Sequence, residues 1–171
     1  MKLTEIEWDM ERPLGKFSGW EDAAEFEVNY LDMISVDREY SPRAMQAIGL
    51  TLATKVRSES DTSGLYSLIK LAGHHAACTL KWNGQWDPED MHDILVAKQK
   101  DYGHGNINRF GVVGVAVRLS DKIERINHLT ERGAQPANES LKDSWIDIVG
   151  YSCIACMLEA GSFRMELKEV A

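Results

Sequence analysis

The 171-residue chain has the composition of an ordinary globular protein, with 44% hydrophobic and 27% charged residues, which argues against wholesale disorder. It carries 19 Lys and Arg against 27 Asp and Glu, and a formal net charge of -8 disfavours sequence-independent binding to duplex nucleic acid. No apolar run reaches the length of a membrane span, the N-terminus is too acidic for a signal peptide, and three cysteines show no framework spacing. We therefore expect a soluble, cytoplasmic protein that binds neither membranes nor duplex nucleic acid.

The first half of the chain is predicted to be helical after an irregular start. Pro13 and two nearby glycines interrupt any pattern over residues 1–20. Further along, apolar residues recur at steps of three and four, the spacing of helices with one buried face. Ser41 can serve as an N-cap, with Pro42 at the first helical position. We predict three helices in this half, over about 20–40, 42–56 and 65–82.

The second half carries clearer helix boundaries. Asp87-Pro88 is a strong helix start with further acids in the first turn, and Gly133 is a C-terminal stop. Asn138 can cap a final helix. We predict helices over about 88–100, 108–132 and 139–159.

No segment alternates convincingly as a strand and no internal repeat occurs, so we predict an all-α fold. Residues 1–86 carry little recognisable chemistry, whereas charged and apolar residues are densely interleaved further along. We therefore divide the chain into an N-terminal helical extension, residues 1–86, and a functional module, residues 87–171.

Two helices of the second half each carry a pair of acids. Asp121 and Glu124 lie opposite the apolar face of one helix. Asp143 and Asp147 lie four residues apart on the next, beside Gly150 and Ile154, and an acidic stripe that continues into apolar residues indicates a buried face. If both pairs face a common cleft, they form an oxygen-rich site of the kind that Mg²⁺, or Mn²⁺ in its place, prefers in proteins. The alternative is that these acids pair with Lys and Arg on solvated helix faces.

The segment between two of these helices is rich in hydrogen-bond donors. Gly103 and Gly105 expose backbone there, and lysines beside them can meet phosphate while amides read a base or sugar. Three cations along the following helix can hold polyphosphate oxygens. The alternative is an ordinary interhelical loop. The candidate substrate-binding residues are Lys98, Asp101, Tyr102, Asn106, Asn108, Arg109, Arg118, Lys122 and Arg125.

The run KQKDYGHGNINRFGVVGVAVRLSDKIERINHL, followed by NESLKDSWIDIVGYSCIACML, resembles the nucleotide modification associated domain 1 family of bacteriophages. The shared motifs are K-x-x-D-Y-G, N-x-x-x-F-G, R-L-x-D-K-x-x-R and N-E-S-x-x-D-x-W-x-D-I, over roughly residues 94–158. That family is similar to the MazG-like all-α nucleoside triphosphate pyrophosphatases.

The resemblance implies a MazG-like helical bundle that cleaves a (deoxy)nucleoside triphosphate to the monophosphate and pyrophosphate with Mg²⁺. It implies an enzyme of phage nucleotide metabolism in the host cytoplasm, acting on the dNTP pool, with dGTP or dATP among the expected substrates. It also implies a dimer or tetramer. The positions that correspond to the family's metal ligands are Asp121, Glu124, Asp143 and Asp147, which are also the expected catalytic residues, with Glu139 as a substitute. This chain has Asp at the first position, and its second pair is spaced by four residues rather than three.

Two other functions remain open at this stage. An HD-type metal phosphohydrolase would use His74 or His75, the dipeptide His92-Asp93 and a distal acid such as Asp147. A non-enzymatic helical interaction protein would bind a partner through residues 20–82.

The C-x-x-C pair Cys153 and Cys156 lies in an apolar helix without a second pair. We therefore expect these cysteines to pack in the core rather than bind zinc.

Overall fold

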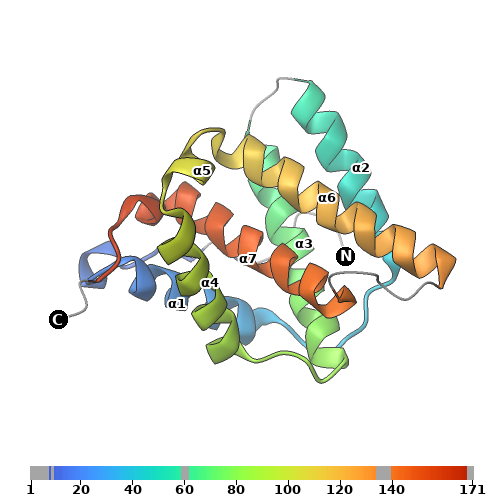
Figure 1. Ribbon diagram of the computed structural model, residues 1–171, viewed down its shortest axis with the longest axis horizontal. Coiled ribbons are helices and arrows are strands. Elements are labelled where there is room, and N and C mark those ends of the chain that lie inside the picture. Colours follow the sequence, from blue (N-terminus) through green and yellow to red (C-terminus); the bar gives the residue numbers. More distant parts are fainter. Residues whose placement is uncertain (1–7, 9, 59–61, 134–139, 169–171) are drawn as a thin grey trace.

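The computed structural model describes residues 8, 10–58, 62–133 and 140–168, and these residues form an all-α structure without strands, as predicted (Figure 1). None of the helices in these ranges is long and apolar enough to cross a membrane. The elements are η1 (Leu14–Lys16), α1 (Trp20–Ile34), α2 (Pro42–Arg57), α3 (Ser63–Trp82), α4 (Pro88–Tyr102), α5 (Gly105–Asn108), α6 (Gly111–Arg132), α7 (Leu141–Ala160) and η2 (Ser162–Arg164).

Helix α7 lies at the centre of the fold (Figure 1). It packs against α3 and α6 along much of its length and also contacts α1 and α4, while α2 covers α3 and α6. Apolar residues occur around most of its circumference, as expected for a central helix. Its closest approach is to α3, where Gly73 faces Ser152 and any larger residue would collide with that side chain.

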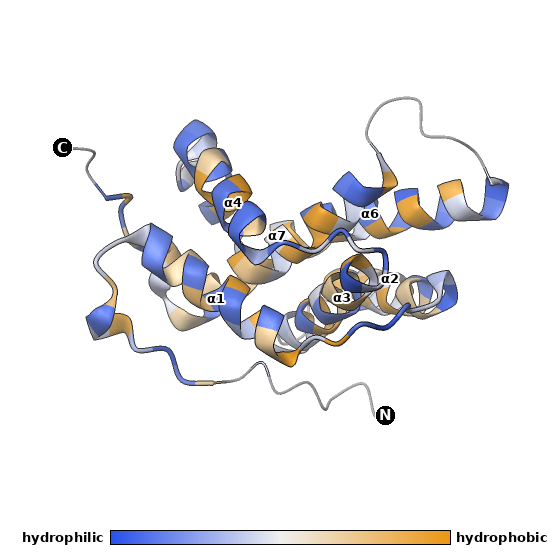
Figure 2. Cartoon of the chain, turned by 90° about the horizontal axis from the view of Figure 1, so that it is seen from below, coloured by the Kyte–Doolittle hydropathy of each residue, from blue (hydrophilic) through white to orange (hydrophobic). Residues whose placement is uncertain are grey.

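One hydrophobic core runs through both halves of the sequence. It extends from Trp8 and the apolar side of α1 to Phe163 in η2, and includes buried residues of every helix from α1 to α7. Figure 2 shows hydrophobic and hydrophilic residues alternating along the helices. Residues 1–86 and 87–171 therefore contribute to a shared interior.

Several helix boundaries follow the predicted signals. The side chain of Ser41 accepts a hydrogen bond from the Ala44 amide at the start of α2, and Asp87 caps α4 in the same way. Gly133 ends α6 in the left-handed conformation, with φ of 59°, that glycine adopts without strain.

Two predicted boundaries are wrong. Helix α1 ends at Ile34 rather than near Tyr40, because the following segment runs extended across α3, where the amide of Val36 lies 3.4 Å from Cys78 Sγ. Helix α7 is capped by Ser140, whose side chain and Asp143 form a reciprocal capping box. Asn138, predicted as the cap, lies outside the described residues.

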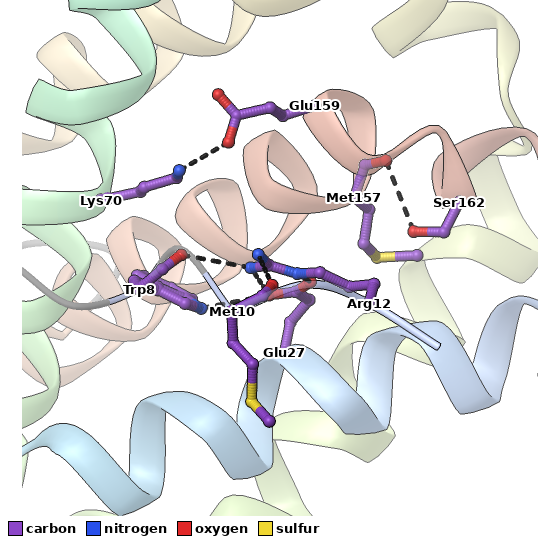
Figure 3. Close-up of polar contacts among 8 residues, drawn as sticks. All are labelled: Trp8, Met10, Arg12, Glu27, Lys70, Met157, Glu159 and Ser162. Atoms are coloured by element: carbon purple, nitrogen blue, oxygen red, sulfur yellow. Dashed lines mark hydrogen bonds and ion pairs between the residues drawn. The ribbon is translucent and has the colours of Figure 1, made fainter. Parts of the chain in front are cut away.

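The segment that precedes α1 is fixed by a buried ion pair (Figure 3). Glu27 of α1 is fully buried, and Arg12 donates to both of its carboxylate oxygens, at 2.7 and 2.8 Å. The indole of Trp8 donates to the same carboxylate at 3.1 Å. These charge-assisted hydrogen bonds compensate for the removal of the carboxylate from water.

Candidate functional site

A pocket of about 320 Å³ opens between α4, α6 and α7, and α1 closes its inner end. Its wall is apolar and buried, whereas its mouth carries polar and charged side chains. The wall includes Trp20, Met91, Leu95, Ile107 and Ile154, and the mouth includes Lys98, Tyr102, Asn106, Arg118 and Asp147.

Helix α7 contributes one continuous stripe to this pocket. Asp147, Gly150 and Ile154 follow one another at steps of three and four residues and all line it. The sequence predicts this stripe to be a shared, buried face, and the structure confirms that it faces other helices. Asp143, one turn earlier, lies outside the pocket.

Asp147 is held between two lysines from different helices. Lys98 of α4 donates to one carboxylate oxygen at 2.8 Å, and Lys122 of α6 lies 2.9 Å from the other. Burial alone would raise the pKa of Asp147, but the hydrogen bonds from both lysines outweigh this and lower it below its usual value. The carboxylate is therefore ionised at neutral pH, and this trio carries a net positive charge.

The predicted cationic side of α6 divides between two roles. Arg118 lines the pocket and donates to the backbone oxygen of Asn106 at 3.5 Å. Arg125 instead donates to the hydroxyl of Ser144 and the backbone oxygen of Ser140. It therefore joins α6 to the first turn of α7 and does not line the pocket.

Only some of the predicted substrate-binding residues between positions 101 and 109 line the pocket. Tyr102 and Asn106 line it, and the Tyr102 side chain is largely exposed at its mouth. Asp101, Asn108 and Arg109 are exposed and do not line it.

The four acids predicted to hold Mg²⁺ are not brought together within the described part of one chain. Asp121 and Glu124 lie on the exposed side of α6. The carboxylate of Asp143 accepts a hydrogen bond from the Ser140 amide in the capping box, so of the four only Asp147 lines the pocket.

Residues 8, 10–58, 62–133 and 140–168 contain no group of three His, Cys, Asp or Glu side chains arranged to hold a metal ion. The described part of one chain therefore does not gather three of the predicted ligands at one point. Glu139, the substitute ligand, lies outside the described residues.

The residues of the HD-type alternative occupy different surroundings. His74 contacts the backbone oxygen of Ile34, and His75 stacks on the ring of Tyr40. His92 contacts the backbone oxygen of Glu21, and Asp93 beside it is exposed.

The two cysteines of the C-x-x-C pair are buried in the core, where burial raises the pKa of both thiols well above its usual value. Their position agrees with the predicted packing role.

Gln99 and Trp20 are among the pocket residues that were not predicted from the sequence. Gln99 continues the buried stripe of Met91 and Leu95 along α4, and a polar residue at the end of an apolar stripe is a signal that was available. Trp20 comes from a distant part of the chain, and no local pattern places it beside α4.

The structure thus defines an all-α protein with a cationic mouth over an apolar pocket. Residues 98–158 match the model of the family described as nucleotide modification associated domain 1, which confirms the predicted resemblance over that segment. The matched segment starts at Lys98 and contains every mouth residue named above. No curated protein and no solved structure matches the chain.

Proposed function

We propose that this protein is a Mg²⁺-dependent (deoxy)nucleoside triphosphate pyrophosphohydrolase that binds its substrate in the pocket between α4, α6 and α7. The reaction adds water across the bond between the α- and β-phosphates and releases the monophosphate and pyrophosphate. The observation that carries this proposal is a cationic mouth over an apolar interior, with the cations supplied by the segment that matches a nucleotide-associated family.

The two ends of the pocket suit the two ends of a nucleotide. A nucleobase is flat and largely apolar, and the buried wall around Trp20 and Leu95 offers it an environment away from water. A triphosphate is strongly anionic, and Lys98 and Arg118 supply positive charge at the pocket. Lys122 does not line the pocket but lies beside it, in its ion pair with Asp147. The chain's overall charge of -8 makes this local cationic cluster notable.

The same cations have a role in the reaction itself. Charge builds up on the phosphoryl oxygens and on departing pyrophosphate as the bond breaks, and fixed ammonium and guanidinium groups stabilise that charge. Asp147 holds Lys98 and Lys122 in place across the mouth. The two ion pairs with Asp147 orient the ammonium groups before the substrate binds.

Magnesium enters the proposal with the substrate, because Mg²⁺ is commonly bound by phosphate oxygens together with only one or two carboxylates. When bound, it would neutralise phosphate charge. Asp147 is the pocket-lining carboxylate near which it would lie. Mn²⁺ is expected to replace it.

The proposal includes a homo-oligomer acting on the dNTP pool of an infected cell's cytoplasm, as the resemblance to MazG-like enzymes implies. An exposed apolar stripe on α6 and the residue before it supports self-association. It consists of Phe110, Val113 and Val117, spaced like one face of a helix.

The decisive experiment is product analysis. Each NTP and dNTP is incubated with the full chain and Mg²⁺, and monophosphate and pyrophosphate are measured together. We expect both products in equal amounts, and we expect Lys98→Ala to raise KM. Lys100→Ala, an exposed lysine on the same helix, is the matched control. Release of inorganic phosphate together with the nucleoside diphosphate, or no turnover of any nucleotide, would overturn the proposal.

A further inference from the structure

Gln99 is a polar side chain in an apolar wall. It is only 7% exposed, it lines the pocket, and it follows Met91 and Leu95 on the buried side of α4. Its side-chain amide makes no hydrogen bond to any other residue that the structure describes, and it is not among the fully enclosed unpaired groups of these residues. The amide is therefore open to the pocket, where a ligand could serve as its hydrogen-bond partner.

Trp20 contributes an aromatic ring to the same wall. Its side chain is buried, and its indole nitrogen is enclosed without an acceptor among the described residues. The ring is fixed in place, since its edge packs against Phe163 with ring centroids 6.2 Å apart. The Trp20 amide also donates to the backbone oxygen of Glu166 at 2.8 Å.

The amide of Gln99 and the ring of Trp20 indicate what this wall of the pocket can recognise. A carboxamide offers one acceptor and two donors in a plane. A flat ring that carries polar atoms on its edge would satisfy the amide and pack against the aromatic wall, whereas a phosphate would meet its cations at the mouth instead. Nucleobase edges present such donors and acceptors side by side.

We infer that Gln99 is the residue that selects the nucleobase, with the ring of Trp20 as part of the wall against which the base lies. This inference rests on the proposed nucleotide substrate. It assigns base recognition to one residue of the matched segment and one residue of the N-terminal half. The N-terminal helices are then part of the site, because α1 closes the pocket in which the base lies.

The test compares three natural dNTPs with analogues that each lack one exocyclic group of the base. The pairs are dGTP with 2-aminopurine deoxyribonucleoside triphosphate, dATP with purine deoxyribonucleoside triphosphate, and dCTP with the analogue that lacks the 4-amino group. We expect the wild-type protein to show a KM about tenfold lower for at least one natural dNTP than for its analogue. Gln99→Met, which keeps the size but removes the amide, should abolish that preference.

Two further variants complete the design. Gln46→Met alters an exposed glutamine of α2 and should keep the wild-type preference. Trp20→Phe keeps an aromatic ring without the N–H and should weaken the preference less than Gln99→Met does. Gln99→Leu replaces Gln99→Met if the latter has lost its helical circular dichroism.

The outcomes separate this inference from the proposed function. Turnover with an unchanged base preference in folded Gln99→Met, or no preference in the wild-type protein, overturns the role of Gln99 and leaves the pyrophosphohydrolase proposal standing. Failure of the wild-type protein to bind or cleave any nucleotide overturns both.

Discussion

Lys98 and Asp147 form an ion pair of 2.8 Å that joins α4 to α7 across the mouth of the pocket. The partners are far apart in the sequence, and Lys122 reaches the other oxygen of the same carboxylate from α6. One partly buried acid therefore ties together the three helices that form the pocket. The arrangement also fixes two cations around a carboxylate that lines the pocket.

The ionisation of Asp147 should respond to loss of either lysine. Burial raises the pKa of this carboxyl and the two lysine hydrogen bonds lower it further than burial raises it. Replacing Lys122 by Met removes one of the two lowering contributions, so the pKa of Asp147 should rise. Carboxyl carbon NMR titration measures this directly, and Lys100→Met is the control for a nearby but exposed lysine. An unchanged titration in Lys122→Met would contradict the ion pair.

The lowered pKa of Asp147 makes the stability of the fold depend on pH. A carboxyl whose pKa is lower in the folded protein than in the unfolded chain stabilises the fold above the unfolded value. That stabilisation is lost as the pH falls through the folded pKa. The wild-type protein should therefore lose the stabilising contribution of ionised Asp147 in acid. This contribution should be smaller in Lys122→Met, so the free energy of unfolding of that variant should fall less as the pH is lowered.

Local signals allowed much of the fold to be predicted. The cap at Asp87 and the stop at Gly133 were predicted correctly, and so was the buried face that Asp147 shares with Gly150 and Ile154. Caps, stops and helical faces depend on a few neighbouring residues and can therefore be recognised locally. The start of α7 was misplaced because Asn138 and Ser140 are both good caps, and only the reciprocal bonds with Asp143 favour Ser140.

The candidate site was less predictable, because it depends on contacts between distant segments. Helical periodicity places Asp121 and Glu124 on a common face but does not say whether another helix covers that face. The structure leaves it exposed. Trp20 reaches the pocket only through the packing of α1 beside α4, which no local pattern reports.

The exposed acids of α6 offer a test of the metal site implied by the resemblance. Asp121→Asn and Glu124→Gln remove charge from exposed side chains, so the free energy of unfolding should change by less than about 0.5 kcal/mol. If these acids bind the metal of the proposed reaction, Mg²⁺-dependent turnover should nevertheless fall steeply. Urea denaturation and pyrophosphate release measure the two effects.

Glu131→Gln, at an exposed acid near the end of the same helix, is the matched control and should retain turnover. Full activity in both Asp121→Asn and Glu124→Gln would show that neither acid is required.

The buried ion pair of Arg12 with Glu27 should contribute strongly to folding. Glu27→Ala leaves the guanidinium of Arg12 and the indole of Trp8 without their shared acceptor (Figure 3). Removing one member of a buried pair typically costs about 3–5 kcal/mol, because the remaining charge is uncompensated. Urea denaturation should show a loss of this order, whereas Glu25→Ala, at an exposed position of α1, should change stability little. Equal stability of the two variants would refute this role.

His75 should make the stability of the fold depend on pH. Its ring is buried and stacks on Tyr40 with centroids 3.7 Å apart. Burial, followed by the nearby His74 and Arg38, lowers the pKa of His75 to about 4. The folded protein therefore keeps this ring neutral at pH values where the unfolded chain binds a proton.

Because the unfolded chain takes up that proton with a pKa of about 6.5, the contribution to stability is complete above this value and declines as the pH falls toward 4. His75→Phe preserves an aromatic ring beside Tyr40 and removes the titration. The fall in Tm between pH 6.5 and 4 should be smaller in this variant than in the wild-type protein. His128→Phe, at an exposed histidine of α6, should keep the wild-type slope, and identical slopes in all three proteins would mean that His75 is not the titrating group.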